Sequence, residues 1–285
     1  MTSVGIDIGG SSVKAASFLD GGLIGTATSS RYSNPERADL TGAIKECLGA
    51  LDIDQIGSVG LCLPGRMNAG HTMVEHSVNI PSLNGWAFED LLGSVISDSG
   101  VATRVVSDAD AAGYDYATEF PVAGRTAAIS LGTGVGLCVL DGEKIVTIGD
   151  GGGIGHLGHM DVGPMGESDR VGRDGARNTL ESYIGAPAMR QWMDGQILNF
   201  AGLTGSDAPI RAIVHALRVV HAIYRPCRIV LLGGVGMALK PHAHMLAGMI
   251  SDGLTPLAAE GWTLEFAISA HHAACGAAKL ASQSC

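Results

Sequence analysis

One pattern of elements occurs twice in this sequence, about half the chain apart. An apolar strand, a glycine-rich loop, a second strand and a tight Asp-Gly turn follow one another over residues 4–22 and again over residues 126–142. Repetition of this kind is typical of an internally duplicated fold. Segments with helical and strand periodicity alternate around both copies, so the sequence predicts two mixed α/β lobes. Two unrelated hairpins are the alternative.

The elements outside the two copies are predicted from periodicity and breakers. Apolar residues at helical spacing predict a helix over 35–51. The other predictions are strands over 56–63, 104–107, 228–232 and 264–269, helices over 86–96, 109–119, 209–224, 243–254 and 272–282, a helix from about 179, and glycine-rich loops over 149–158 and 233–236.

The glycine-rich loops indicate which class of ligand this protein could bind. Glycine contributes 42 of 285 residues, about twice the usual share. Without a Cβ atom, backbone N–H groups can converge on phosphate oxygens. The first loop is followed by a strand rather than a helix, which disfavours a dinucleotide fold, and the absence of a Gly-Lys dipeptide excludes the Walker A motif. We therefore expect nucleotide phosphates at these loops; purely structural turns are the alternative.

Composition narrows the class of protein. The formal net charge is −10, with only 18 Lys and Arg residues, which disfavours nucleic acid as a partner. No apolar run reaches the roughly 18 residues of a membrane helix, and the start MTSVGID lacks the features of a signal peptide. Six scattered cysteines suggest neither disulfides nor a Cys-rich zinc site. We expect a cytoplasmic protein without membrane contact.

An ordered set of motifs resembles the ROK sugar kinases. These motifs are DIGGSSVKAA (7–16), LPG (63–65), NIPSLNGW (79–86), SDADAAG (107–113), SLGTGVG (130–136), GHLGHMDV (155–162), LESY (180–183) and LLGGVG (231–236). The resemblance implies a duplicated actin-like (ribonuclease H-like) two-lobed ATPase fold. Its first lobe would span 1–115 and its second 116–269, with a last helix over about 270–285 packed back on the first. It also implies a homodimer.

The resemblance further implies an ATP-dependent carbohydrate kinase, with Asp108 as general base and Asp7 holding Mg²⁺ through water. The position of Asp108 between a strand and a helix suits a carboxylate that projects into a cleft; a helix cap before Ala109 is the alternative. The implied ATP-binding residues are Asp7, Gly9, Gly10, Ser11 and Lys14, then Gly132, Thr133 and Gly134, and an adenosine loop of Gly233, Gly234 and Val235. The implied sugar-binding residues are Gly65, Asn79, Ser107, Asp108, His156, His159 and Glu181.

Several positions depart from the family pattern. His156 stands where the family has glutamate, and Ser107 and Asp110 replace asparagines. A neutral imidazole donates once and accepts once, whereas a carboxylate only accepts, so we expect an altered sugar preference. A metal held by His156 and His159 is the weaker alternative.

The family's zinc-binding cysteines are missing from residues 169–181, so we predict no zinc. Contacts of Arg173 and Arg177 with Asp169 or Asp174 are one way to order this segment instead; a solvated run of charges is the favoured interpretation.

Two other functions stay open at this point. The substitutions are compatible with a sugar-binding regulatory or degenerate protein with little turnover. The missing cysteines also resemble the polyphosphate-dependent glucokinases, although a net charge of −10 gives polyphosphate little support and favours ATP. The repressors of the family carry a DNA-binding segment ahead of the first loop, where this sequence has no residues.

Overall fold

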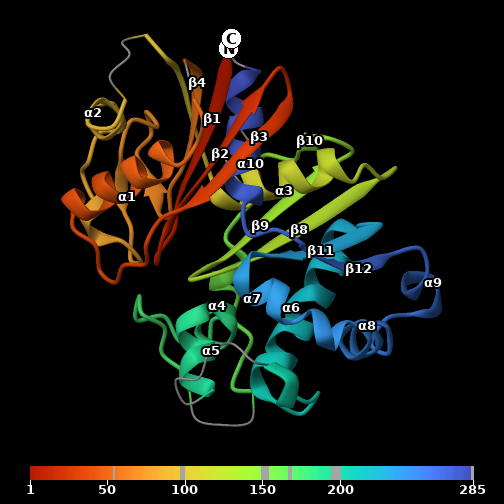
Figure 1. Cartoon of the computed structure of the whole chain (residues 1–285). Helices are drawn as coiled ribbons and strands as arrows, with labels where there is room; N and C mark the ends of the chain where they lie inside the picture. Colours follow the sequence, from red (N-terminus) through yellow and green to blue (C-terminus); the bar gives the residue numbers. More distant parts are fainter. Residues whose placement is uncertain (54, 97–99, 149–153, 166–168, 194–199, 284–285) are drawn as a thin grey trace. The chain divides into compact units, whose positions relative to one another are not determined.

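The computed structural model describes residues 1–53, 55–96, 100–148, 154–165, 169–193 and 200–283. The chain divides into two compact units (Figure 1). Unit 1 comprises Met1–Asp115 and His271–Cys285, and unit 2 comprises Tyr116–Ala270. The chain therefore passes twice between the units, once within a helix and once in the segment before the last helix.

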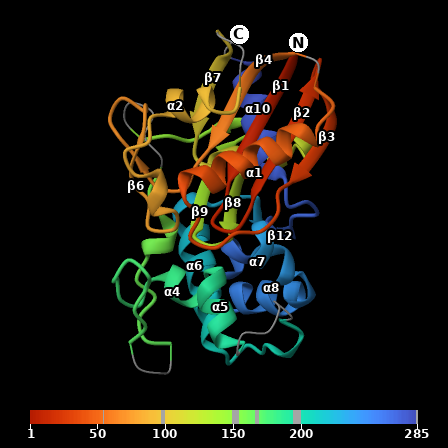
Figure 2. The same ribbon diagram turned by 60° about the vertical axis from the view of Figure 1, so that its left-hand side comes forward.

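Unit 1 is built on a five-stranded mixed sheet in the order β3-β2-β1-β4-β7. The antiparallel strands are β1 (Thr2–Ile8), β2 (Val13–Leu19) and β3 (Gly22–Thr28), and β4 (Ile56–Cys62) and β7 (Ala102–Val106) continue the sheet parallel to β1. Every residue of β1 is buried, as expected for a strand covered on both faces. Figure 2 shows α1 (Arg37–Gly49) across one face of the sheet and α10 (His272–Ser282) on the other.

Short elements complete unit 1. They are a two-stranded sheet of β5 (Arg66–Met67) and β6 (Val74–His76), the 3₁₀ turn η1 (Pro81–Leu83), α2 (Phe88–Gly93) and the start of α3 (Asp108–Glu119). Side chains from α1, α2 and the sheet form its largest core, which includes Ile6, Leu40, Ile44, Leu61 and Leu91.

Glycines bring α10 directly against the sheet. A Cβ atom at Gly5 of β1 would overlap the carbonyl oxygen of Ala274, and one at Gly60 of β4 would overlap that of Ala277. Only hydrogen in place of a side chain permits this approach. Because β1 and β4 lie side by side at the centre of the sheet, α10 is fixed across the middle of unit 1.

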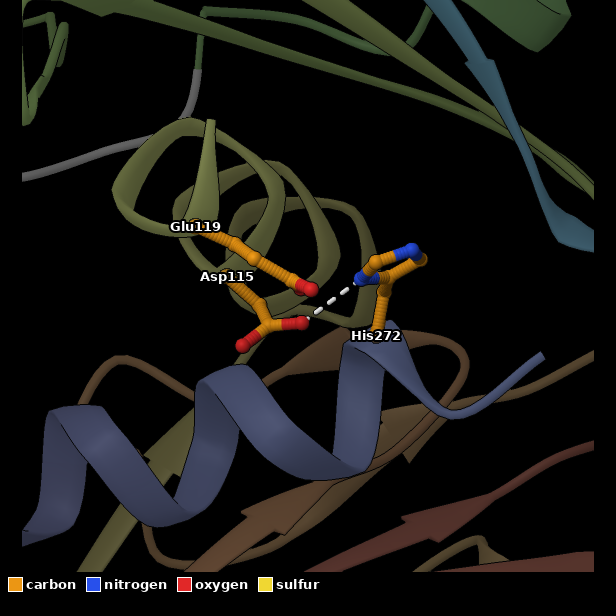
Figure 3. Close-up of side chains that lie close together, drawn as sticks. All are labelled: Asp115, Glu119 and His272. Atoms are coloured by element: carbon orange, nitrogen blue, oxygen red, sulfur yellow. Dashed lines mark hydrogen bonds and ion pairs between the residues drawn. The ribbon is translucent and has the colours of Figure 1, made fainter. Parts of the chain in front are cut away.

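A buried ionic network joins α10 to α3 within unit 1. The carboxylate of Asp115 lies 2.6 Å from Nδ1 of His272 and 2.6 Å from Nζ of Lys279. Figure 3 shows the carboxylate pointing toward the imidazole from the neighbouring helix. Asp115 and His272 are both buried, so the charge of Asp115 is balanced by its partners rather than by water. The network lies where the chain leaves and re-enters unit 1.

Unit 2 repeats the sheet of unit 1. Its order is β10-β9-β8-β11-β12, in which β8 (Arg125–Leu131), β9 (Val135–Asp141) and β10 (Lys144–Ile145) are antiparallel. β11 (Arg228–Leu232) and β12 (Thr263–Phe266) then extend the sheet parallel to β8. Strand order and strand direction match those of unit 1, which confirms the α/β class and the internal duplication.

The helices of unit 2 pack on this sheet and on one another. They are α4 (Leu180–Ile184), α5 (Ala186–Trp192), α6 (Ala208–Tyr224), α7 (Gly233–Ala238), α8 (Ala243–Ser251) and α9 (Pro256–Ala259), with 3₁₀ turns η2 (Leu157–His159), η3 (Phe200–Gly202) and η4 (Lys240–His242). The apolar stripe of α6 carries Ile210, Ile213 and Leu217 into the core beside Ile129 and Leu231. No helix in the described ranges is long and apolar enough to cross a membrane.

The structure corrects several boundaries. Residues 233–236, expected as a loop, lie in the first turns of α7, because Gly233 turns the chain with φ +78° and the helix then begins at once. The helix expected over 86–96 is limited to Phe88–Gly93, and the strand expected over 264–269 ends at Phe266. β3, β5, β6 and β10 were not predicted. Residues 149–153 of the expected glycine-rich loop lie outside the described residues.

Candidate active site

Asp108 begins α3 directly after β7 ends at Val106. The hydroxyl of Ser107 accepts a hydrogen bond from the backbone N–H of Asp110 at 3.0 Å, so Ser107 has the capping role considered above for Asp108. Asp108 itself accepts through Oδ1 from the N–H of Ala109 at 2.8 Å, and its side chain is open to solvent. The helix start does not need Asp108 as its cap.

The environment of Asp108 favours its protonated form. Desolvation by the surrounding chain raises the pKa of the Asp108 carboxyl to about 6, and the negative charges of Asp7 and Asp110 contribute to the rise. Asp108 is exposed to solvent, so water weakens the effect of desolvation on its pKa. The negative charges of Asp7 and Asp110 are therefore the better supported cause of the rise. A carboxyl with this pKa is ionised at neutral pH but basic enough to take a proton.

The first glycine loop connects Asp7 and Lys14, which face each other in the register of β1 and β2. Lys14 Nζ lies 3.5 Å from Asp7 Oδ2. Within the loop, the N–H of Gly9 donates to the carbonyl of Ser12 at 3.1 Å. Tyr32 closes the loop from outside, since its hydroxyl donates to the carbonyl of Gly9 at 2.6 Å and its N–H donates to that of Ser11 at 3.1 Å.

Tyr32 was not predicted from the sequence. It lies in the irregular segment after β3, where no motif marks it. Burial is the main cause that raises the pKa of its hydroxyl, with a contribution from Asp7, so the hydroxyl stays protonated and remains a hydrogen-bond donor to the loop.

Gly10 and Ser11 are partly accessible at the tip of the first loop. Gly65 follows β4 with φ +121°, a conformation that suits glycine, and Asn79 lies half-buried in the segment before η1. Neither Gly65 nor Asn79 is hydrogen-bonded to Asp7 or Asp108 in the part of the chain that the structure describes.

In unit 2, the start of α5 and a side chain of α4 hold the second glycine loop. The N–H of Ala186 donates to the carbonyl of Gly132 at 2.8 Å, and Gly185 lies against Thr133. Oε2 of Glu181 accepts from the N–H of Val135 at 3.0 Å, directly after Gly134. The expected sugar-binding glutamate is therefore bonded to the end of the expected phosphate loop.

His156, His159 and Glu181 lie together around Gly158. The two imidazole rings stack with centroids 4.3 Å apart. A Cβ atom at Gly158 would lie 3.0 Å from Glu181 Oε2 and 3.1 Å from His156 Cε1, so the missing side chain permits this arrangement. Desolvation, then the proximity of His159, lowers the pKa of His156, whereas desolvation raises that of Glu181. His156 is thus held in the neutral form.

The remaining predicted residues of unit 2 lie at the start of α7. A Cβ atom at Gly233 would approach the carbonyl oxygen of Leu131 to 2.5 Å, which explains a glycine there. Gly234 and Val235 follow in the same helical turn. Gly233 therefore packs at the end of β8, immediately before the second glycine loop.

Residues 169–181, for which no zinc was predicted, contain one of the ion pairs considered in the sequence analysis. Arg177 lies 3.8 Å from Asp169, but both side chains are largely exposed, and such a pair contributes little. His159 Nε2 lies 3.7 Å from Asp174 Oδ2. Within the described residues, no group of three metal-ligating side chains includes His156 or His159.

The candidate residues form two sets, one in each unit. Unit 1 contains Asp7, Gly9, Gly10, Ser11, Lys14, Gly65, Asn79, Ser107 and Asp108; unit 2 contains Gly132, Thr133, Gly134, His156, His159, Glu181, Gly233, Gly234 and Val235. Each set combines a glycine loop with polar side chains suited to a polyhydroxylated ligand.

Comparisons with known proteins agree on one family. The ROK family model matches residues 3–284. The N-acetylmannosamine kinase of Salmonella arizonae is 30% identical over 259 residues, which cover 84% of each chain. That of Citrobacter koseri is 27% identical over 267 residues, covering 87% of this chain and 89% of the relative.

A solved structure shows the same fold. The ROK family glucokinase from Streptomyces griseus, in complex with glucose and AMPPNP, has a TM-score of 0.72 at 19% identity, covering 99% of this chain and 100% of the other. This likeness confirms the predicted duplicated actin-like fold class.

Proposed function

The chain belongs to the ROK family, and we propose that it is an ATP-dependent sugar kinase that transfers the γ-phosphate of ATP to a hydroxyl of a hexose or hexose derivative. The relatives named above phosphorylate sugars according to their names. N-acetylmannosamine is the first substrate to test, because both curated relatives carry it in their names.

The observation that carries the proposal is the placement of Asp108. Phosphoryl transfer to a hydroxyl needs a base that accepts the hydroxyl proton while the reactants are held in line. Asp108 presents a carboxylate at the start of α3, and desolvation, together with the adjacent charges of Asp7 and Asp110, raises its pKa to about 6. A base with this pKa is ionised at neutral pH and still has affinity for the proton.

The residues around Asp7 fit a divalent cation. Asp7 and Asp110 are close enough to Asp108 that their negative charges raise its pKa. A hard cation with oxygen ligands would relieve the repulsion among these three carboxylates. Mg²⁺, when bound, neutralises charge on the phosphates. Asp7 would hold it, through water, beside the first glycine loop. We propose no zinc.

The glycine loops of both units would bind the nucleotide. Backbone N–H groups at Gly10 and Ser11, with Lys14, and at Thr133 and Gly134 would contact the phosphates, while the N–H groups of Gly9 and Gly132 close the two loops by donating to the carbonyls of Ser12 and Gly134. Residues 233–235 would contact the adenosine. Lys14 supplies a positive charge near the first loop, balanced in this structure by Asp7.

The sugar would contact Gly65, Asn79, Ser107, His156, His159 and Glu181, besides Asp108. The Ser107 hydroxyl accepts from Asp110, which leaves its own proton for a sugar oxygen. Neutral His156 offers one donor and one acceptor, a choice that a carboxylate lacks. We propose that this difference alters sugar selectivity.

The test is ADP release with Mg·ATP across hexoses and N-acetylhexosamines, with mass spectrometry of the sugar product. A sugar-dependent rise in ADP together with a phosphorylated sugar supports the proposal. Sugar binding without any product would indicate a binding protein, and turnover only with polyphosphate would assign another donor.

We also propose that the protein is a cytoplasmic homodimer. Light scattering would measure the mass of the particle in solution and so test the dimer.

A further inference from the structure

Asn178 fastens the segment 169–179 to the rest of unit 2. Its side-chain oxygen accepts from the N–H of Arg170 at 3.0 Å and lies 3.3 Å from the hydroxyl of Tyr183. Its side-chain amide donates to Oδ1 of Asp169 at 2.8 Å. Its backbone N–H donates to the carbonyl of Arg170 at 2.8 Å, and its carbonyl accepts from the N–H of Val162 at 2.9 Å.

The residue type at 178 fits these demands. The backbone of Asn178 has φ +53°, a conformation that asparagine tolerates better than most residues. Asn178 is only 9% exposed, and its amide both donates and accepts, which the opposite polarities of its partners require. Neither glycine nor aspartate supplies both properties.

Arg170 adds a second attachment next to Asn178. Its guanidinium lies over the ring of Tyr183 at 5.1 Å and over that of Trp192 at 4.9 Å. The planar cation thus rests against aromatic rings from α4 and α5, an arrangement that the ammonium of lysine does not reproduce. Asn178 and Arg170 therefore join segment 169–179 to both helices.

These attachments lie beside two predicted sugar-binding residues. The N–H of Leu180 donates to the carbonyl of Met160 at 2.8 Å, so residues 178–180 pair with residues 160–162. His159 immediately precedes residues 160–162, and Glu181 immediately follows residues 178–180. The side chain of Glu181 in turn accepts a hydrogen bond from the N–H of Val135, which links the paired segments to the second glycine loop.

We propose that Asn178, together with Arg170, is a positioning residue that fixes His159 and Glu181 in the sugar site. This inference rests on the proposed sugar-kinase function. Asn178 acts through the backbone of residues 160–162 and 178–181, and not by contact with sugar or phosphate. The segment is ordered by hydrogen bonds and stacking among protein groups.

Kinetics of four variants test the proposal. Asn178→Gly keeps the left-handed backbone but loses every side-chain bond, and Asn178→Asp keeps the shape but places a carboxylate against Asp169. Arg170→Lys keeps the charge without the planar stacking. Arg177→Ala is the matched control, since it removes an exposed arginine of the same segment.

In Asn178→Gly and Asn178→Asp we expect the KM for sugar to rise about tenfold, because a buried hydrogen-bonding group is lost or mismatched, while the KM for ATP changes less. Arg170→Lys gives a smaller rise in the same direction, and Arg177→Ala leaves the KM for sugar unchanged. An unchanged KM for sugar in both Asn178 variants would overturn the proposal. So would an equal effect in the Arg177→Ala control.

A readout without turnover keeps this test separate from the proposed function. Hydrogen exchange at the amides of Val162, Leu180 and Val135 follows the positions themselves. In Asn178→Gly these three amides exchange faster than in the wild type, whereas those of β11 do not. Unchanged exchange at all three would refute the positioning role even in a protein that phosphorylates no sugar. Absence of turnover in the wild type, with faster exchange in the variant, would refute only the kinase proposal.

Discussion

The pH dependence of turnover follows from the pKa of Asp108. A general base acts only when deprotonated, so kcat/KM for sugar should fall on the acid side with the pKa of this carboxyl in the free enzyme. The structure raises that pKa to about 6, whereas an unperturbed aspartate titrates near about 4.

The two values give different rates at pH 5. With a pKa of about 6, roughly a tenth of the enzyme carries the ionised base at that pH, and kcat/KM is about one-tenth of its neutral plateau. With a pKa of about 4, about nine-tenths of the plateau would remain. The assay is direct quantification of ADP at limiting sugar between pH 4.5 and 8, which avoids coupling enzymes that fail in acid.

Asp110→Asn provides the control, because it removes one negative charge beside Asp108 and leaves the base in place. The acid limb of this variant should move to lower pH, since fewer neighbouring charges then oppose ionisation. A profile flat down to pH 5 in the wild type would refute a base with the raised pKa of Asp108. An acid limb that Asp110→Asn moves upward would contradict its electrostatic cause.

Three further predictions concern the fold and the metal. Gly5→Ala lowers the free energy of unfolding by about 1–3 kcal/mol or more, because its Cβ would overlap α10, whereas Gly42→Ala, with open space on α1, raises it by about 0.5–1 kcal/mol in the same urea titration. Asp115→Ala removes the buried carboxylate that contacts His272 and the partly buried Lys279 and costs about 3–5 kcal/mol, whereas Glu75→Ala, which breaks an exposed pair, costs about 0–1 kcal/mol; equal losses in chemical denaturation would disprove this distinction. EDTA abolishes sugar-dependent ADP release and added Mg²⁺ restores it, since Asp7 is proposed to hold the cation; full activity in EDTA would contradict that role.

Local signals predicted the duplicated α/β frame, because the strands flanking the glycine loops are buried and the Asp-Gly turns are short-range. β3 was missed since most of its residues are exposed, which removes the apolar pattern. The glycines of 233–236 suggested a loop, yet they serve close packing: a Cβ at Gly236 would lie 2.9 Å from the backbone of Leu231. Packing against Leu231, which local composition does not reveal, explains why residues 233–236 form a helix rather than a loop.

In the candidate site, too, some residues could be predicted from sequence motifs, whereas contacts between distant residues could not. Motif order supplied Asp7, Asp108 and the loops as hypotheses, but the hydrogen bond from Tyr32 to the first loop joins residues 23 positions apart and has no local signature. The contacts of Asn178 also have no local signature, because they depend on its left-handed backbone and on partners at Arg170, Tyr183 and Val162. The capping hydroxyl of Ser107, three residues before Asp110, by contrast has a recognisable local pattern.

The most direct test of Asp108 as the general base compares wild type with Asp108→Asn at saturating Mg·ATP and sugar, with sugar affinity measured by calorimetry on both proteins. If Asp108 is the general base, sugar-dependent ADP release falls in the variant by about 10²–10⁴-fold, the usual contribution of a general base, while the Kd for sugar changes only a few-fold. Turnover of Asp108→Asn at the wild-type rate would contradict the assignment of Asp108 as the base and, with it, the proposed mechanism.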